Sequence, residues 1–70
     1  MYNAQQRRKV HVDANGPYVK MYGLVFRLPA NMPVEIGSFI DVEFEHGAFI
    51  TLAHFRVGGR KYWTCARHKV

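Results

Sequence analysis

The fold follows from residues 38–67, SFIDVEFEHGAFITLAHFRVGGRKYWTCAR, in which two glycine-containing pairs separate three runs rich in β-branched and aromatic residues. The pairs are His46-Gly47 and Gly58-Gly59. Two-residue hairpin turns need positive φ, which glycine adopts readily. The pattern therefore predicts three consecutive antiparallel strands. We expect them at residues 38–45, 48–57 and 60–67.

Two further strands are expected upstream of this meander. The first lies at residues 9–13, where valines alternate with polar residues in the period of a half-buried strand. Residues 14–17, ANGP, indicate a turn. Residues 18–28 are then predicted to form one long strand, with a bulge or sharp bend at Gly23. We therefore expect an all-β fold, a small five-stranded antiparallel barrel or bent sheet, similar in architecture to SH3-like or OB-like barrels.

The length of 70 residues indicates a single domain with one small core. We expect residues 1–8, MYNAQQRR, to be a flexible basic N-terminal arm and residues 9–70 to form the single small β-barrel domain. The lone cysteine, Cys65, excludes an intrachain disulfide and fits a reducing compartment. With no secretory leader and no apolar run long enough to span a membrane, we expect a cytoplasmic protein with no membrane partner.

The charge balance favours a polyanionic partner. Ten Lys and Arg residues against five Asp and Glu residues give a formal net charge of +5 and an isoelectric point near 9.8. So strong a positive field on a short chain suits association with nucleic acid. Aromatic residues make up 14% of the chain, which is enough to fill a β core and to leave some rings facing a partner.

The two turns fix the strand register, and the register decides which side chains share a face. Two-residue turns would pair Phe44 with Phe49, and Phe55 with Tyr62. The face predicted to form the core then collects Ile40, Val42, Phe44, Phe49, Thr51, Ala53, Phe55, Val57, Tyr62 and Ala66. The row predicted on the opposite face is Phe39, His54 and Trp63, with Arg56 and Lys61 opposite each other at its end. A slip of one residue at either turn would exchange the two faces.

Rings flanked by positive charge are typical of sites for single-stranded nucleic acid, because every base offers a face for stacking and every phosphate attracts a cation. We therefore expect a non-enzymatic nucleic-acid-binding module that prefers single-stranded DNA or RNA. The residues predicted to stack on bases are Phe39, His54 and Trp63. The residues predicted to contact phosphates are Arg7, Arg8, Lys9, Arg56, Arg60, Lys61 and Arg67.

The same face also suits a second function, contact with protein. Trp, Phe and Arg are the residue types enriched in protein–protein hot spots. The alternative is a small interaction module, either a regulator or inhibitor that docks on a larger protein or a homo-oligomer such as a homodimer. The apolar residues of this face, which the first strands or a second copy would cover, are Phe39, Ile50, Leu52, Trp63 and Cys65.

The sequence does not predict a metal site. The candidate ligands are His46, His54, Cys65 and His68, of which Cys65 and His68 form a Cys-x-x-His pair. Zinc sites usually combine two such close pairs. The other half is missing, because His46 belongs to a predicted turn and His54 to the face opposite His68. No metal and no cofactor are expected.

Catalysis is not predicted either. A Cys65 nucleophile with His54 or His68 as its base lacks a third orienting group and oxyanion donors. The carboxylates of Asp41, Glu43 and Glu45 alternate along one strand, as expected of a solvent-facing surface, and we expect them to pair with Arg67.

Overall fold

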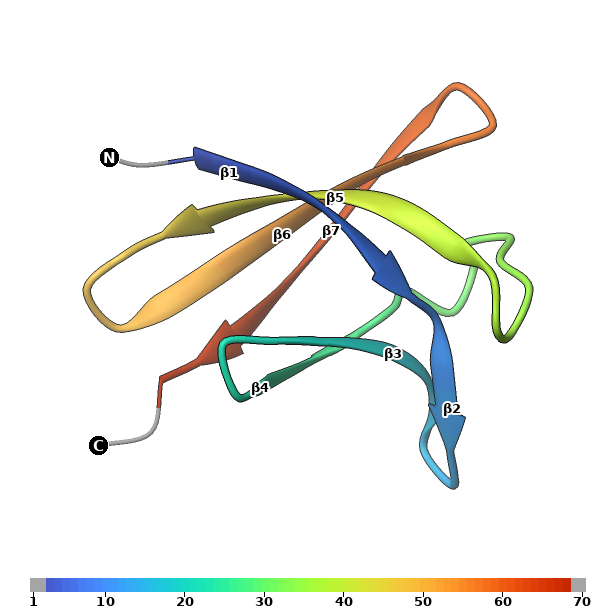
Figure 1. Ribbon diagram of the computed structural model, residues 1–70, viewed down its shortest axis with the longest axis horizontal. Coiled ribbons are helices and arrows are strands. Elements are labelled where there is room, and N and C mark those ends of the chain that lie inside the picture. The colour runs from blue at the N-terminus through green and yellow to red at the C-terminus, as the bar shows by residue number, and fades with distance from the viewer. Residues whose placement is uncertain (1–2, 69–70) are drawn as a thin grey trace.

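The computed structural model describes residues 3–68, with side chains described from residue 5 onward. These residues form seven strands and no helix, so none of them belongs to a helix that could cross a membrane (Figure 1). The strands are β1 (Asn3–Lys9), β2 (His11–Asp13), β3 (Gly16–Met21), β4 (Leu24–Arg27), β5 (Phe39–His46), β6 (Ile50–Val57) and β7 (Arg60–Arg67).

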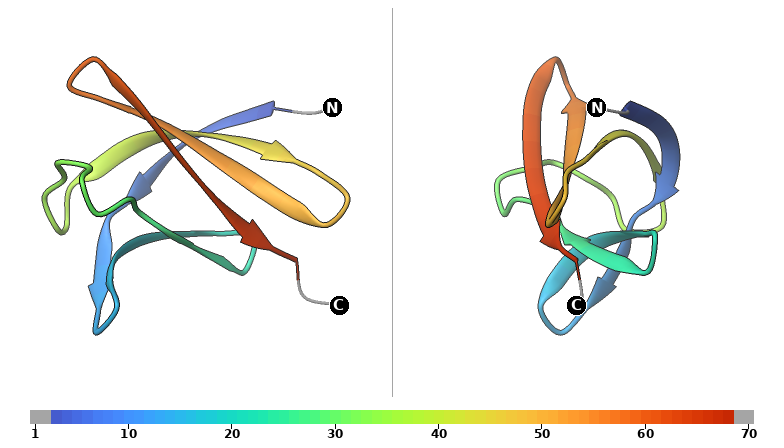
Figure 2. Two further views of the ribbon diagram at one scale, coloured as in Figure 1. Left: turned by 180° about the vertical axis from the view of Figure 1, so that it is seen from behind. Right: turned by 90° about the vertical axis from the view of Figure 1, so that its left-hand side faces the viewer.

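The strands make two antiparallel sheets, one in the order β1-β5-β6-β7 and the other in the order β2-β3-β4. The predicted all-β, antiparallel fold is therefore confirmed. The prediction of five strands in one small barrel or bent sheet is corrected in its detail, because the described residues form seven strands in two sheets and no closed barrel. Strand β4 lies beside β7, but no ladder of backbone hydrogen bonds joins them among the described residues, so the two sheets stay separate (Figure 2).

Val10 is the point where the chain passes from one sheet to the other. Strands β1 and β2 follow each other with only this residue between them, and the chain bends sharply there (Figure 1). Its N–H donates to the carbonyl of Ser38 and its carbonyl accepts from the N–H of Gly37, both at 2.8 Å. Its side chain is completely buried. Because a bent backbone keeps its hydrogen bonds at this point, the bend is compatible with burial.

The core lies between the two sheets. Its buried apolar residues are Val10, Val19, Phe26, Leu28, Met32, Val42, Phe44, Ala53, Phe55 and Tyr62. The rings of Phe26 on β4 and Phe44 on β5 meet at 5.2 Å between centroids, which joins the sheets across the core. Side chains alternate along a strand, so every second residue of β5 and β6 points to this side.

The predicted β6–β7 turn is confirmed. Gly58 and Gly59 have φ of 60° and 79°, the positive values that a two-residue turn of this kind requires. Phe55 pairs with Tyr62, as the turn predicts.

The predicted β5–β6 turn is wrong. Phe44 pairs with Ala53 rather than with Phe49, four positions further along β6. His46 is a strand residue opposite Thr51, and a longer loop, closed by a hydrogen bond of 2.8 Å from Gly47 N–H to the Ile50 carbonyl, replaces the two-residue turn. The shift is an even number of residues, so the faces do not exchange. The core face was therefore predicted correctly except at Phe49, which lies in the loop and is 80% exposed.

A strand replaces the expected flexible arm. Residues 3–9 form β1 and pair with β5 along its length, from Asn3 opposite Glu45 to Lys9 opposite Phe39. The segment has no apolar alternation because half-buried polar residues fill its inner side. One of them, Arg8, places its Nη1 atom 3.4 Å from the sulfur of Met21. Of the predicted arm, Met1 and Tyr2 lie outside the described residues.

The predicted long strand at residues 18–28 is also corrected, because it is a hairpin of β3 and β4. Tyr22 and Gly23 form the turn, with φ of 55° and 72°. Tyr22 pays a steric penalty there, since positive φ is unfavourable for a side chain with a Cβ atom. Its ring compensates by packing edge-on against His46 at 4.5 Å and Phe44 at 5.6 Å. The predicted turn at residues 14–17 is confirmed by the β2–β3 hairpin.

Candidate nucleic-acid interface

The outer face of the four-stranded sheet carries the site expected from the sequence. On this face, β6 and β7 contribute four directly paired couples of residues. The couples are Arg56 and Lys61, His54 and Trp63, Leu52 and Cys65, and Ile50 and Arg67. We call these residues the β6–β7 strip. It contains three formal cations and no carboxylate.

The predicted row of three rings is only partly formed. His54 and Trp63 are direct cross-strand neighbours, as predicted. Phe39 does not join them, because the longer β5–β6 loop brings Glu43 opposite His54 instead. Phe39 lies near the start of β5, is 57% exposed and pairs with Lys9. His54 and Trp63 thus lie side by side on this face, and Phe39 lies apart from them.

Trp63 is the most prominent feature of the strip. The indole side chain is 64% exposed, and it stands between Lys61 and Cys65 on the same face of β7. The couple Arg56 and Lys61 lies one step further along, and the two cations face each other as predicted. Neither forms an ion pair within 4.0 Å with any described residue. Two like charges directly opposite are unfavourable, and an anion between them would relieve this repulsion.

An acidic stripe borders the strip. It consists of Asp41, Glu43 and Glu45, which alternate along the outer face of β5. Strand β6 separates the stripe from β7. One contact crosses the border, at 3.4 Å between His54 Nε2 and Glu45 Oε1. The expected pairing of the carboxylates with Arg67 is not found among the described ion pairs, since the register places Arg67 opposite Ile50.

The other predicted phosphate contacts are dispersed. Arg7 and Lys9 lie on the outer face of β1, beyond the acidic stripe and opposite Asp41 and Phe39. Arg8 points to the inner side, because alternate residues of a strand face opposite ways. Arg60 is exposed at the end of the β6–β7 turn, opposite Val57, and so lies close to the strip without belonging to its face.

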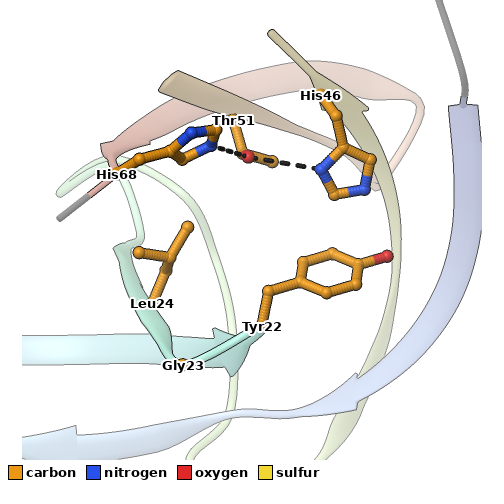
Figure 3. A pocket seen from close by; sticks show the side chains of 6 residues that line it. All are labelled: Tyr22, Gly23, Leu24, His46, Thr51 and His68. Atoms are coloured by element: carbon orange, nitrogen blue, oxygen red, sulfur yellow. Dashed lines mark hydrogen bonds between the residues drawn. The ribbon is translucent and has the colours of Figure 1, made fainter. Parts of the chain in front are cut away.

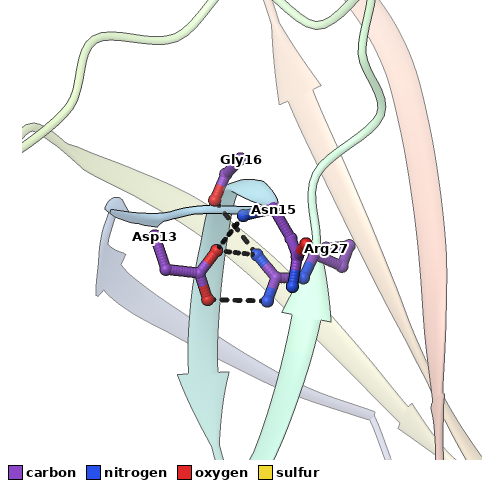
Figure 4. Close-up of polar contacts among 4 residues, drawn as sticks. All are labelled: Asp13, Asn15, Gly16 and Arg27. Atoms are coloured by element: carbon purple, nitrogen blue, oxygen red, sulfur yellow. Dashed lines mark hydrogen bonds and ion pairs between the residues drawn. The ribbon is translucent and has the colours of Figure 1, made fainter.

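Sequence reasoning missed a polar cluster on the outer face of the three-stranded sheet (Figure 4). Arg27 donates from Nη1 to Asp13 Oδ1 and from Nη2 to Oδ2, both at 2.7 Å, and from Nη1 to the Gly16 carbonyl at 3.0 Å. The backbone N–H of Asn15 donates to Asp13 Oδ1 at 2.8 Å. These bonds, that from Arg27 first, lower the pKa of Asp13 from 3.8 to about 2. The Asp-x-Asn spacing at the turn was the only sequence signal for it.

Arg27 also completes a stack across the three strands of this sheet. Its guanidinium carbon lies 5.1 Å from the ring centroid of Tyr18, and Tyr18 stacks on His11 at 5.5 Å. Both terminal nitrogens of Arg27 are therefore bonded to the protein itself. The cluster joins β2, β3 and β4, and we interpret it as a structural element rather than a binding site.

An open cleft of about 440 Å³ lies where the β3–β4 turn meets the ends of β5, β6 and β7 (Figure 3). Its lining residues are Tyr22, Gly23, Leu24, His46, Thr51 and His68. The hydroxyl of Thr51, which is buried, bridges His46 Nδ1 at 3.3 Å and His68 Nε2 at 2.7 Å. This contact fixes the end of β7 against the β5–β6 hairpin.

The candidate metal and catalytic residues do not converge. Cys65 is exposed on the outer face opposite Leu52, whereas His68 is held by Thr51 on the inner side. His54 lies opposite Trp63. Within residues 3–68, no three His, Cys, Asp or Glu side chains are grouped as metal ligands would be.

Comparison with known protein families, curated proteins and solved structures finds no match for this chain.

Proposed function

We propose that the protein is a non-enzymatic nucleic-acid-binding module that prefers single strands and binds them on the β6–β7 strip. The observation that carries this proposal is the exposed indole of Trp63 beside cations that have no carboxylate partner among the described residues. Like charges directly opposite each other are unfavourable, and an exposed indole offers a face on which a base can stack, so a single strand suits both features at once.

The chemistry assigns separate roles to the residues. Trp63 stacks on a base, which contributes about 1–3 kcal/mol per base in single-strand sites. His54, directly beside it, supports the same base or a neighbouring one. The cations that contact phosphates are Arg56, Lys61 and Arg67, with Arg60 at the turn. An OB-like or SH3-like barrel type and a cytoplasmic location stay predictions, and the proposal depends on neither.

The test compares two variants, each lacking one exposed ring. Their affinities for a labelled oligothymidylate are measured by fluorescence anisotropy at low salt. Trp63→Ala should weaken binding about 10- to 100-fold, because it removes the stacking contribution. Phe39→Ala is the matched control, since Phe39 is similarly exposed but lies outside the strip. It should leave the affinity unchanged. Equal losses in both variants would contradict the assignment of the site to β6 and β7.

A second function, protein contact, is favoured by the β5–β6 loop. Phe49 at this loop is 80% exposed, and Ile50 next to it is 36% exposed. Large exposed rings on small domains commonly mark protein interfaces. If the protein forms a homodimer through this loop, light scattering should give twice the chain mass, and Phe49→Ala should reduce it to that of the monomer. A monomeric wild-type mass that Phe49→Ala does not change would count against a homodimer.

A further inference from the structure

We infer that the acidic stripe confines a bound nucleic acid to the β6–β7 strip and thereby selects against duplexes. This inference rests on the proposed function and names the residues that set its preference for one strand. Asp41, Glu43 and Glu45 would not touch the ligand, but they would determine which form of nucleic acid fits.

The positions of the cations set the direction of the bound strand. The cations lie along β7 and its partner β6, at Arg56 and Lys61 near one end and at Arg67 near the other. A strand that follows β7 meets a cation at both ends with Trp63 between them. A strand that crosses the sheet instead passes from Trp63 and His54 directly onto Glu43. The charge pattern therefore favours a path along β7.

The spacing of the cations on β7 sets the length of that path. Lys61 and Arg67 are six residues apart, which is about 20 Å at the rise of a β-strand. Stacked nucleotides in one strand are about 3.4 Å apart, so the strip accommodates about six of them at most. Fewer fit if the strand is more extended.

The distance between β5 and β7 decides where a second backbone would lie. Neighbouring strands lie about 4.8 Å apart, so the outer face of β5 is about 10 Å from that of β7. The two backbones of a B-form duplex are separated by grooves about 6 and 12 Å wide. A duplex with one backbone on β7 therefore places its other backbone, on the side toward the rest of the sheet, above the acidic stripe.

The carboxylates of the stripe are suited to this effect. Asp41 and Glu43 are exposed, and neither forms an ion pair within 4.0 Å with a described residue. Glu43 lies between Gln5 and His54 in the register, so its charge in particular is available to repel a second line of phosphates, whereas Asp41 lies opposite Arg7. An open depression of about 440 Å³ lies over this region, where the stripe borders the strip, and its lining residues are Gln5, Asp41, Glu43, His54, Phe55 and Arg56.

The test measures the ratio of dissociation constants for a duplex and for a single strand of the same length. Glu43→Gln should lower this ratio at least about twofold at low salt, because its charge lies within about 10 Å of the second backbone of a duplex, whereas its effect on the backbone over β7 is common to both probes and cancels. The double variant Asp41→Asn/Glu43→Gln should lower it about fourfold by the same estimate. Both variants retain Glu45 and its contact with His54.

Glu35→Gln is the matched control, because Glu35 is exposed and lies in the loop before β5. It removes the same charge and should improve binding of both probes equally, so that the ratio stays at the wild-type value. Single-strand binding with a ratio that does not respond to Glu43→Gln would overturn the inference and leave the proposed function standing. Absence of binding to both probes would overturn the two together.

The length of the oligonucleotide gives an independent readout. The affinity for oligothymidylates should rise with length up to about six nucleotides and then change only slowly. An affinity that keeps rising steeply with longer probes would show that the strand continues across the sheet, and this would contradict confinement by the stripe.

Discussion

The two sheets carry the same residue types on their outer faces but use them differently. On the three-stranded sheet, Arg27 lies over Tyr18 at 5.1 Å and is bonded through both terminal nitrogens to Asp13. On the four-stranded sheet, Arg56 and Lys61 lie near Trp63 with no carboxylate within 4.0 Å among the described residues. A cation beside a ring thus serves the fold where the chain supplies the anion. Where the described part of the chain places no carboxylate within that distance, the pair is available to an external anion.

The comparison predicts opposite consequences for removal of the two rings. Trp63→Ala should reduce oligonucleotide affinity about 10- to 100-fold and leave the stability almost unchanged, because the side chain is mostly exposed. Tyr18→Ala should leave the affinity unchanged and lower the free energy of unfolding by about 1 kcal/mol or more, through loss of the contact with Arg27 and of ring packing. Urea unfolding and anisotropy on the same samples measure both. The comparison fails if the two variants behave alike.

A carboxylate placed in the strip should make it resemble the Arg27 cluster. Cys65→Asp introduces one on the same face as Trp63 and Arg67, at an exposed position. We expect binding to weaken about three- to tenfold, because the new charge repels phosphates and pairs with a cation. Cys65→Asn has the same shape without the charge and should bind like the wild type. If the asparagine variant loses as much affinity, the effect is steric and the electrostatic explanation is wrong.

The cations of the strip should determine the salt dependence of binding. Each phosphate contact contributes about 0.7 to the slope of the logarithm of affinity against the logarithm of salt concentration. Arg56→Ala and Lys61→Ala should each lower this slope by about that amount. Lys20→Ala is the control, because Lys20 is exposed on the three-stranded sheet. Titrations at several salt concentrations measure the slope, and an equal decrease in the Lys20 variant would indicate a diffuse effect of net charge.

The Asp13–Arg27 pair should affect stability in acid and not binding. Its hydrogen bonds lower the pKa of Asp13 from 3.8 to about 2, so the folded state favours the ionised carboxyl. This contribution is fully present above the ordinary pKa of 3.8 and is lost as the pH falls through about 2. Asp13→Asn should therefore be less stable than the wild type at neutral pH, and the difference should disappear toward pH 2. Thermal unfolding at a series of pH values measures it; a difference that does not change with pH would show that the pair is not its source.

The parts of the fold that the sequence predicted are those with a strong local signal. Gly58-Gly59 supplied two residues suited to positive φ, and the register of β6 and β7 followed from it. The Tyr22-Gly23 turn has the same geometry, but its tyrosine is stabilised by Phe44 and His46, which are distant in sequence. No local pattern contains that information. Strand β1 was missed for a similar reason, because it forms through backbone pairing with β5 and not through apolar alternation.

The positions of the candidate site residues were predicted correctly where the strand register was predicted correctly. His54, Trp63, Arg56 and Lys61 all depend on the β6–β7 turn and lie as expected. Phe39 depended on a two-residue turn at His46-Gly47, and the longer loop moved it out of the row. His46 is a strand residue paired with Thr51, and its side chain contacts the Thr51 hydroxyl, which also bonds to His68. A contact of this kind between three separated residues is decided by the tertiary fold.

The most direct test of the proposed site is the fluorescence of Trp63 during titration with single-stranded oligonucleotide. The chain contains one tryptophan, so the signal reports on the strip alone. A base stacked on the indole should quench the emission at low salt, and increasing salt should reverse the quenching as phosphate contacts are lost. Emission that stays constant throughout the titration, even at the lowest salt concentration, would contradict the account.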